Sequence, residues 1–192
     1  MKQNKKIAIT GGIGSGKSLF CDILKSMGYE VYSCDEIYRE MLQNKEYLAL
    51  LNNQFPDCFM DGRLLNKKLL AERVFANEEN RKTLESLSHP VIMQRLLAQM
   101  DGKGLVFAEV PLLFEGGYEG LFDDVIALVR SQEARVKGVI ERSGLTESEV
   151  LSRMQSQFDP ALLPNKKCII VENNGTKEDL EKKAKEIVRK LG

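Results

Sequence analysis

The sequence lacks an excess of either charge. Its 192 residues include 28 Lys and Arg and 28 Asp and Glu, so the formal net charge at pH 7 is zero. A protein that binds nucleic acid non-specifically usually carries a basic excess, because phosphate contacts supply most of its affinity. With 43% hydrophobic and 29% charged residues, the composition is not that of a disordered chain. We expect one folded domain with a small insertion and no nucleic-acid partner.

Clustered cysteines and histidines are also missing. No C-x-x-C pair occurs among Cys21, Cys34, Cys58 and Cys168, and the single histidine is His89. A structural zinc site would have to gather its ligands from scattered places, so we expect none. The pattern favours reduced thiols in a cytoplasmic protein.

Long apolar runs are absent. The basic start, with Lys5 and Lys6, is followed only by the short apolar run Ile7-Ala8-Ile9. This run is too short for the centre of a signal peptide. Nothing approaches the 18 consecutive apolar residues that suggest a membrane span. We therefore expect neither export nor membrane insertion.

What the sequence does contain is an alternation of strand and helix patterns. The segment Lys17–Met27 places its apolar residues on one helix face and is followed by Gly28. Near the end of the chain, Thr176 and Asp179 have the spacing of an N-cap and its N3 partner. The five strand candidates are short and apolar, as buried parallel strands are: Lys6–Thr10, Glu30–Ser33, Leu105–Val110, Val125–Val129 and Cys168–Val171.

Two insertions interrupt this alternation. The first, roughly 34–104, reads as wholly helical, with helices at Asp35–Gln43 and Lys67–Leu87 and a loop at Asn52–Arg63. The second contains a Thr146/Glu149 capping box, and two helices hinged at Ser143-Gly144 would resemble a lid. We expect three parts, which are a core (about 1–34, 104–130 and 165–192), a helical substrate lobe (about 35–103) and a lid (about 131–164).

The decisive motif is Gly11-Gly12-Ile13-Gly14-Ser15-Gly16-Lys17-Ser18, which matches G-x-x-x-x-G-K-[ST] between a strand and a helix. Its glycines let successive N–H groups point at phosphate oxygens, and the helix N-terminus adds its positive dipole. Lys17 would reach the β- and γ-phosphates, and the Ser18 hydroxyl would ligate Mg²⁺. The motif predicts nucleoside triphosphate binding and a P-loop NTPase fold, a three-layer α/β/α sandwich with a five-stranded parallel sheet.

The remaining motifs favour a kinase over a switch. Asn165-Lys166-Lys167-Cys168 begins like the base-reading N-K-x-D motif of GTPases but lacks its Asp. Glu109 ends an apolar strand, where it could hold the metal or its water shell, or could simply accept hydrogen bonds. Asp35 follows the second strand, at the edge where ligands collect. It could accept the proton of a substrate hydroxyl, and it could also be the N-cap of Glu36–Gln43.

Basic residues of the predicted lid could close over a transferring phosphoryl group. Arg153 and Gln157 are four residues apart, which predicts one shared helix face. Exposed helix arginines are more often solvated surface. The lid candidates are Arg135, Arg142, Arg153 and Gln157.

Taken together, these motifs make the sequence resemble the dephospho-CoA kinases over essentially the whole chain. The resemblance rests on Thr10–Ser18, Asp35-Glu36-Ile37, Ser88-His89-Pro90, Pro111-Leu112-Leu113-Phe114-Glu115, the lid residues above and Asn173-Asn174-Gly175. The Pro-Leu-Leu-Phe-Glu run together with the preceding His-Pro is the most specific part. The resemblance implies ATP-dependent, Mg²⁺-assisted phosphorylation of the ribose 3′-hydroxyl of dephospho-CoA, which gives coenzyme A and ADP.

The resemblance also implies roles for single residues. Asp35 would be the base or hydroxyl-orienting group, and Arg142 the lid arginine near the phosphates. Asn173 and Gly175 would lie near the adenine of ATP. On the acceptor side would lie His89 and the run from Leu112 to Glu115. From the residues alone, His89 could equally be the N-cap of a helix Val91–Met100, and the apolar run could equally be core.

Three positions depart from the family pattern. Ser33-Cys34-Asp35 stands where the family usually has Asp-Ala-Asp, which favours Asp35 as the catalytic carboxylate. Lys67 replaces an arginine of the helical insertion, so a two-pronged phosphate contact is lost there. Lys167-Cys168 replaces the usual Ala-Asp before the last strand.

Two alternative functions are also compatible with the sequence. One is a different P-loop kinase, for nucleoside monophosphates or a small alcohol such as shikimate. The other is a nucleotide-dependent switch without an acceptor. For any of them we expect small-molecule partners and a monomer or weak homo-oligomer.

Overall fold

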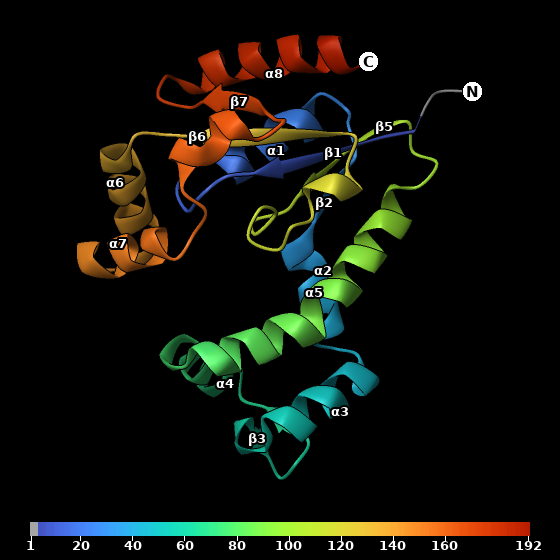
Figure 1. The fold of residues 1–192 in the computed structure, drawn as a ribbon, viewed down its shortest axis with the longest axis vertical. Coiled ribbons are helices and arrows are strands. Elements are labelled where there is room, and N and C mark those ends of the chain that lie inside the picture. Colours follow the sequence, from blue (N-terminus) through green and yellow to red (C-terminus); the bar gives the residue numbers. More distant parts are fainter. Residues whose placement is uncertain (1–3) are drawn as a thin grey trace. The chain divides into compact units, whose positions relative to one another are not determined.

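The computed structural model describes residues 4–192 and divides the chain into two compact units (Figure 1). The first unit runs to Ser33 and resumes at Met100, and the second is Cys34–Gln99. The elements of the first unit are β1 (Lys5–Thr10), α1 (Lys17–Ser26), β2 (Val31–Ser33), β5 (Leu105–Glu109), a 3₁₀ turn (Glu119–Leu121), β6 (Asp124–Val129), α6 (Gln132–Ser143), α7 (Glu147–Gln155), a 3₁₀ segment (Pro160–Asn165), β7 (Ile169–Glu172) and α8 (Lys177–Leu191).

The first unit is built on a five-stranded parallel sheet with the order β2-β5-β1-β6-β7. Strand β1 is central and pairs with β5 on one side and β6 on the other. The connection that leaves β1 leads to β2 on one side of it, and the connection that leaves the neighbouring β5 leads to β6 on the other side. The carboxyl ends of β1 and β5 are therefore the place where a ligand crevice is expected. The predicted five-stranded α/β fold is confirmed.

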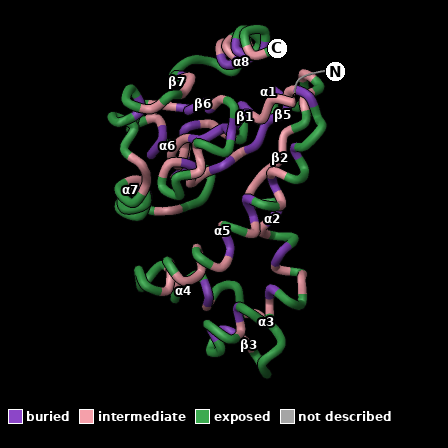
Figure 2. The backbone as a smooth tube through the Cα atoms, turned by 45° about the vertical axis from the view of Figure 1, so that its right-hand side comes forward, coloured by how far each residue is buried: buried purple, intermediate pink, exposed green. Residues whose placement is uncertain are grey.

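Both faces of the sheet are buried. On one face, side chains of alternating strand residues such as Ile7, Phe107 and Ile126 form one core with α1 and α8. On the other face the neighbouring residues Ala8, Val106, Ala108, Val125 and Ala127 are equally buried. Figure 2 shows this concentration of buried residues along the strands. Burial on two faces explains why the strands read as continuous apolar runs.

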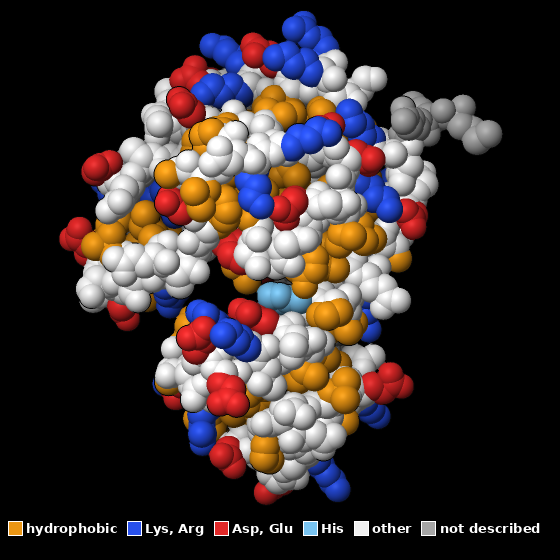
Figure 3. Space-filling model, viewed as in Figure 1, with side chains coloured by type: hydrophobic (Ala, Val, Ile, Leu, Met, Phe, Trp, Pro, Cys, Tyr) orange, Lys and Arg blue, Asp and Glu red, His pale blue; other side chains and the backbone are white. Residues whose placement is uncertain are grey.

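The helix ends of the first unit follow the expected local chemistry. Capping boxes are present at Thr146/Glu149 and Thr176/Asp179, which confirms both predictions. Gly144 ends α6 in the left-handed conformation, with φ of 68°, so the predicted break between α6 and α7 lies at Ser143-Gly144. Figure 3 shows Lys and Arg side chains over α8, with Asp and Glu side chains among them.

The second unit differs from the predicted all-helical lobe. Its elements are α2 (Cys34–Met41), α3 (Lys45–Gln54), a 3₁₀ turn (Pro56–Cys58), β3 (Phe59–Met60), β4 (Leu64–Leu65), α4 (Lys67–Ala76) and α5 (Glu78–Met100). The expected loop Asn52–Arg63 is partly the end of α3 and partly a small antiparallel hairpin of β3 and β4. Asp61 and Gly62, with φ of 50° and 65°, supply the positive-φ turn that the hairpin needs.

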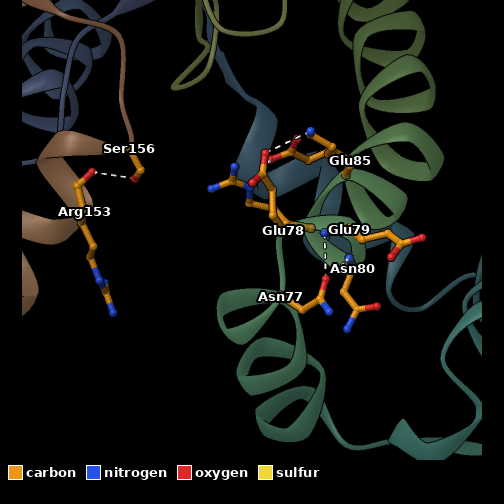
Figure 4. A network of polar contacts seen from close by, with 9 residues as sticks. Asn77, Glu78, Glu79, Asn80, Glu85, Arg153 and Ser156 are labelled. Atoms are coloured by element: carbon orange, nitrogen blue, oxygen red, sulfur yellow. Dashed lines mark hydrogen bonds and ion pairs between the residues drawn. The ribbon is translucent and has the colours of Figure 1, made fainter.

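The single helix predicted at Lys67–Leu87 is in fact two. Asn77 has extended backbone angles, and its side-chain Oδ1 accepts the N–H groups of Glu79 and Asn80 at 2.8 and 3.1 Å (Figure 4). This asparagine therefore ends α4 and caps α5, a role that periodicity of apolar residues does not reveal.

The predicted helix start at His89-Pro90 is wrong. Helix α5 continues through Pro90, which lies inside it, and Figure 1 shows the helix changing direction along its length. Proline interrupts the backbone ladder there, but Ile92, Met93 and Leu96 beyond it are buried. Burial of this apolar stripe offsets the lost hydrogen bond, so His89 is an interior helix residue and not an N-cap.

The N-cap reading of Asp35 is also wrong. Helix α2 starts at Cys34, so Asp35 is the second helical residue and lies in the first turn with Glu36. A carboxylate there still complements the helix dipole. Its side chain is exposed, which leaves it accessible for other chemistry.

None of the helices in residues 4–192 combines the length and apolar character that a bilayer crossing requires. Within the same residues, no group of three or more His, Cys, Asp or Glu is arranged to hold a metal ion.

Candidate active site

The candidate site lies at the carboxyl ends of β1 and β5. The segment Gly11–Ser18, here called the phosphate loop, connects β1 to α1. Glu109, the last residue of β5, is in register with Ile9 of β1 and with Ser33 of β2. The sheet thus brings three chain segments far apart in sequence to one edge.

The phosphate loop is a tight turn that only glycine can make in places. The Ser15 N–H donates to the Gly12 carbonyl at 3.2 Å. Gly14 and Gly16 have φ of 75° and 97°, in the region that side chains disfavour. Gly16 then caps α1, so the N–H groups of the first turn of α1 point toward the loop and favour an anion.

Lys17 is folded back on this loop. Its Nζ donates to the Gly11 carbonyl at 2.7 Å and to the Gly12 carbonyl at 3.2 Å. Both acceptors are neutral, whereas a phosphate oxygen is an anion and makes the stronger hydrogen bond. The ammonium is therefore held next to the cradle by contacts that a phosphate could replace.

Ser18 and Glu109 provide oxygen atoms at the edge of the loop. The Ser18 Oγ donates to Glu109 Oε1 at 3.4 Å. Mg²⁺ prefers oxygen ligands, keeps several waters and is usually bound by one or two side chains plus substrate phosphates. A hydroxyl and a carboxylate beside the phosphate loop fit this ion, and the absence of a larger acidic cluster in the described residues does not count against it.

The segment 131–164, here called the lid segment, contacts the phosphate loop through Arg135 and Gln157. Arg135 Nε donates to the Ile13 carbonyl at 2.8 Å, and Gln157 Oε1 accepts the Ile13 N–H at 2.7 Å. Arg135 is in the first turns of α6 and is 7% exposed. Gln157 follows the end of α7 at Gln155, so the predicted shared helix face of Arg153 and Gln157 is wrong.

Arg142 has a different environment from Arg135. It lies in the last turn of α6, seven residues further on, and its side chain is exposed. Seven residues are about two helical turns, so the two arginines are on the same side of α6 but about 10 Å apart along its axis. In this structure the arginine at the loop is Arg135. Sequence reasoning named it only as one of several lid candidates.

Asn173, which follows β7, also supports the phosphate loop. Its Nδ2 donates to the Ser15 carbonyl at 2.9 Å, and the side chain is buried. A Cβ on Gly16 would lie only 2.1 Å from Asn173 Nδ2, so this close contact requires glycine. Gly175 faces a similar limit, because a Cβ there would lie 2.8 Å from Asp179 Oδ2. The structure thus gives Asn173 a packing role next to the loop and Gly175 a packing role against Asp179 in the first turn of α8.

The run Pro111–Glu115 follows β5 and contacts the lid segment. Leu113 is fully buried, whereas Leu112 is half-buried. The Phe114 ring lies 4.7 Å from the Phe158 ring, and Glu115 Oε1 accepts the Phe158 N–H at 2.8 Å. A small cavity beside the phosphate loop is lined by residues of the loop region, of this run and of the lid segment, including Thr10, Gly11, Pro111, Phe114, Gln157 and Phe158.

Two predicted site residues belong to the second unit. Asp35 follows β2 by two residues, and its backbone carbonyl accepts Arg39 Nε at 3.2 Å. His89 is a half-buried residue of α5. Burial lowers its pKa from the ordinary value, while Glu85 one turn earlier acts in the opposite direction.

Comparison with known proteins decides the family. A family model described as dephospho-CoA kinase matches residues 5–179, which include the phosphate loop, the lid segment and both halves of the sheet. The chain belongs to the dephospho-CoA kinase family.

Individual dephospho-CoA kinases agree with this assignment. The enzyme of that name from Thermus thermophilus is 37% identical over 187 residues, which cover 96% of this chain and 91% of the relative. A solved structure from Thermus thermophilus, also 37% identical, covers 100% of both chains with a TM-score of 0.86. The dephospho-CoA kinase structure from Campylobacter jejuni is 29% identical, has a TM-score of 0.71 and covers 97% of this chain and 96% of its own.

Dephospho-CoA kinases phosphorylate dephospho-CoA in the final step of coenzyme A biosynthesis, with ATP as the phosphoryl donor. The chain is thus a phosphotransferase, as the resemblance implied. The two alternatives from the sequence, another small-molecule kinase and a nucleotide switch, are not favoured.

Proposed function

We propose that this chain transfers the γ-phosphoryl group of ATP to the ribose 3′-hydroxyl of dephospho-CoA at the carboxyl edge of its sheet. The observation that carries the proposal is the phosphate loop with Lys17, Ser18 and Glu109 at that edge. Phosphoryl transfer requires mainly positioning and charge stabilisation, and these groups supply both.

On the nucleotide side, the backbone of the phosphate loop binds the ATP phosphates. The residues that we assign to this cradle are Gly12, Ile13, Gly14, Ser15, Gly16, Lys17 and Ser18. Lys17 exchanges its contacts with Gly11 and Gly12 for the β- and γ-phosphates. Asn173 and Gly175 follow the end of β7 and bound the adenine side, and Asn173 also supports the loop.

Mg²⁺ would be held by the Ser18 hydroxyl, with Glu109 binding it directly or through water. When bound, the ion supplies positive charge that neutralises the phosphate oxygens during transfer. Within the protein, Glu109 orients the Ser18 hydroxyl through the hydrogen bond that already joins them.

On the acceptor side, Asp35 takes the proton of the 3′-hydroxyl or orients that hydroxyl. Support comes from the chain order, because Asp35 follows Ser33, and Ser33 is in register with Glu109 at the same sheet edge. Arg142 stabilises the charge on the transferring phosphoryl group from the lid segment. His89, Leu112 and Glu115 bind the remainder of the acceptor.

The proposal includes a cytoplasmic location and action on small molecules without a nucleic-acid partner, as a monomer or weak homo-oligomer. The described residues include all four cysteines and contain no disulfide, which suits a reducing compartment.

An acceptor panel tests the proposal. The purified protein is given ATP and Mg²⁺ with dephospho-CoA, with adenosine monophosphate or with shikimate, and ADP is measured. We expect ADP in amounts stoichiometric with dephospho-CoA, and phosphate on the 3′-oxygen of the product by NMR. Turnover with adenosine monophosphate or shikimate instead, or phosphate on another oxygen, would refute it.

A further inference from the structure

The lid segment holds one residue of the phosphate loop by both of its backbone polar groups. The Ile13 carbonyl accepts Arg135 Nε at 2.8 Å, and the Ile13 N–H donates to Gln157 Oε1 at 2.7 Å. Arg135 and Gln157 come from opposite ends of the lid segment, one near the start of α6 and one after α7. Because both peptide groups of Ile13 are tied, the backbone angles on either side of it are fixed.

Packing reinforces these two hydrogen bonds. The Ile13 side chain packs against the small core of the lid segment, formed by Val136, Val139 and Val150. A Cβ on Gly12 would lie 2.3 Å from Arg135 Nη2, and a Cβ on Gly14 would lie 2.9 Å from the Arg135 carbonyl. The phosphate loop around Ile13 therefore packs directly against α6. The glycines on both sides of Ile13 allow this close contact because they have no Cβ.

The burial and the charge of Arg135 favour a lasting contact with the phosphate loop. It is 7% exposed, and burial lowers its pKa, but guanidinium groups start so far above neutrality that it stays charged. A buried cation is costly unless it is well paired, and a backbone carbonyl is the partner found here. An anionic ligand on the adjacent loop would complete its pairing.

We propose that Arg135 and Gln157 are positioning residues that set the shape of the phosphate loop through Ile13. By holding this peptide on the lid side, they keep the following loop residues, Gly14 to Ser18, in the arrangement that binds the nucleotide phosphates. Nucleotide affinity thus depends on the lid segment even before an acceptor binds. This inference rests on the proposed ATP-dependent function but concerns only its nucleotide step.

The test separates nucleotide binding from turnover. Gln157→Met removes the acceptor of the Ile13 N–H and keeps a side chain of similar length. Arg135→Met removes the donor to the Ile13 carbonyl. The affinity for ATP is measured by calorimetry without acceptor, and KM for ATP, KM for dephospho-CoA and kcat by steady-state assay. Gln155→Met is the matched control, because Gln155 is the exposed last residue of α7, two residues before Gln157.

We expect Gln157→Met to weaken ATP binding roughly 3- to 10-fold and Arg135→Met roughly 10- to 100-fold, the range for neutral and charged hydrogen bonds. The KM for dephospho-CoA should change less than about 2-fold, the level of the Gln155→Met control. Because Ile13 is the shared partner, the double variant should lose less affinity than the product of the single losses. Arg135→Lys, which keeps a donor, should recover part of the affinity.

Unchanged ATP affinity in a folded Gln157→Met variant, or a loss equal to that of Gln155→Met, would overturn the inference. A double variant whose loss of ATP affinity equals the product of the two single losses would also overturn it. So would a defect confined to the KM for dephospho-CoA. If Arg135→Met does not fold, Gln157→Met and Arg135→Lys decide the matter. Failure of the wild-type protein to phosphorylate dephospho-CoA would instead contradict the proposed function, since ATP binding is measured without that acceptor.

Discussion

Asn173 donates its buried side-chain amide to the Ser15 carbonyl at 2.9 Å and so joins the end of β7 to the phosphate loop 158 residues earlier in the chain. The loop is thereby supported at two of its residues, by Arg135 and Gln157 at Ile13 and by Asn173 at Ser15. A glycine-rich turn has much conformational entropy to lose, and these contacts restrict it before a ligand arrives.

The Asn173 contact should contribute to both stability and nucleotide binding. Asn173→Ala leaves the Ser15 carbonyl without its partner, so we expect the free energy of unfolding to fall by about 1–3 kcal/mol. Denaturant unfolding measures this change. Asn174→Ala is the matched control, since Asn174 is exposed and its side-chain oxygen accepts the Ser131 N–H instead of contacting the phosphate loop. Equal effects of the two substitutions would contradict the role of Asn173.

The exposed carboxylate of Asp35 should be needed for the chemical step. Asp35→Asn keeps the size of the side chain but removes its basicity, so we expect kcat to fall roughly 10²-fold or more. The affinity for ATP, measured by calorimetry, should not change. Glu36→Gln alters the neighbouring exposed carboxylate and should leave kcat near the wild-type value. Near-normal turnover of Asp35→Asn would remove Asp35 from catalysis.

Arg142 should act on the transferring phosphoryl group more than on acceptor binding. Loss of a charge-stabilising donor lowers kcat by roughly 10²-fold in comparable sites, and we expect Arg142→Ala to show a loss of this order. Steady-state and single-turnover kinetics separate the chemical step from binding. Arg189→Ala, which removes an exposed arginine of α8, is the control. A raised KM for dephospho-CoA with unchanged kcat would show that the assigned role is wrong.

The pair Ser18 and Glu109 should determine the requirement for Mg²⁺. Removing a ligand, or the group that orients it, typically costs 10- to 100-fold in metal affinity. We therefore expect Ser18→Ala and Glu109→Gln to raise the Mg²⁺ concentration for half-maximal activity roughly 10-fold or more. Titration of activity with Mg²⁺ at fixed ATP measures it. Ser26→Ala, at the far end of α1, should titrate like the wild type, and an unchanged Mg²⁺ midpoint in both site variants would exclude this metal site.

His89 should make stability depend on pH near neutrality. Burial lowers the pKa of His89 below its ordinary value of 6.5, so the unfolded chain binds the proton more readily than the native protein does. Its stabilising contribution is complete above pH 6.5 and is lost as the pH falls through the lowered pKa. Denaturant midpoints between about pH 7.5 and 5.5 should fall less in His89→Gln than in the wild type. Parallel curves for the two proteins would contradict this account.

Local signals in the sequence predicted the sheet and the phosphate loop well. Each end of the five strands in the parallel sheet lies within one residue of its predicted position. The agreement is close because strands buried on both faces leave continuous apolar runs in the sequence. The capping boxes at Thr146 and Thr176 were predicted correctly, since a cap depends on residues three positions apart. The phosphate loop likewise needs its glycines, lysine and serine at fixed spacing.

The second unit was predicted less well, because its local signals compete with packing. Pro90 and His89 read as a helix start, yet the buried stripe beyond Pro90 continues α5 through it. Asn77 does not interrupt the apolar periodicity, but its side chain caps α5 and divides the helical run. A single sequence does not show which of two compatible local choices the packing stabilises.

The sequence by itself determined the fold class, the phosphate loop and the resemblance to dephospho-CoA kinases, because each depends on residues that are near one another in the chain. Only the tertiary structure decided that Arg135 and not Arg142 lies on the loop, that Gln157 binds Ile13, and that Asn173 binds Ser15. These partners are 122 to 158 residues apart. Their pairing follows from the order of the strands in the sheet, which brings distant segments to one edge and has no local signature in the sequence.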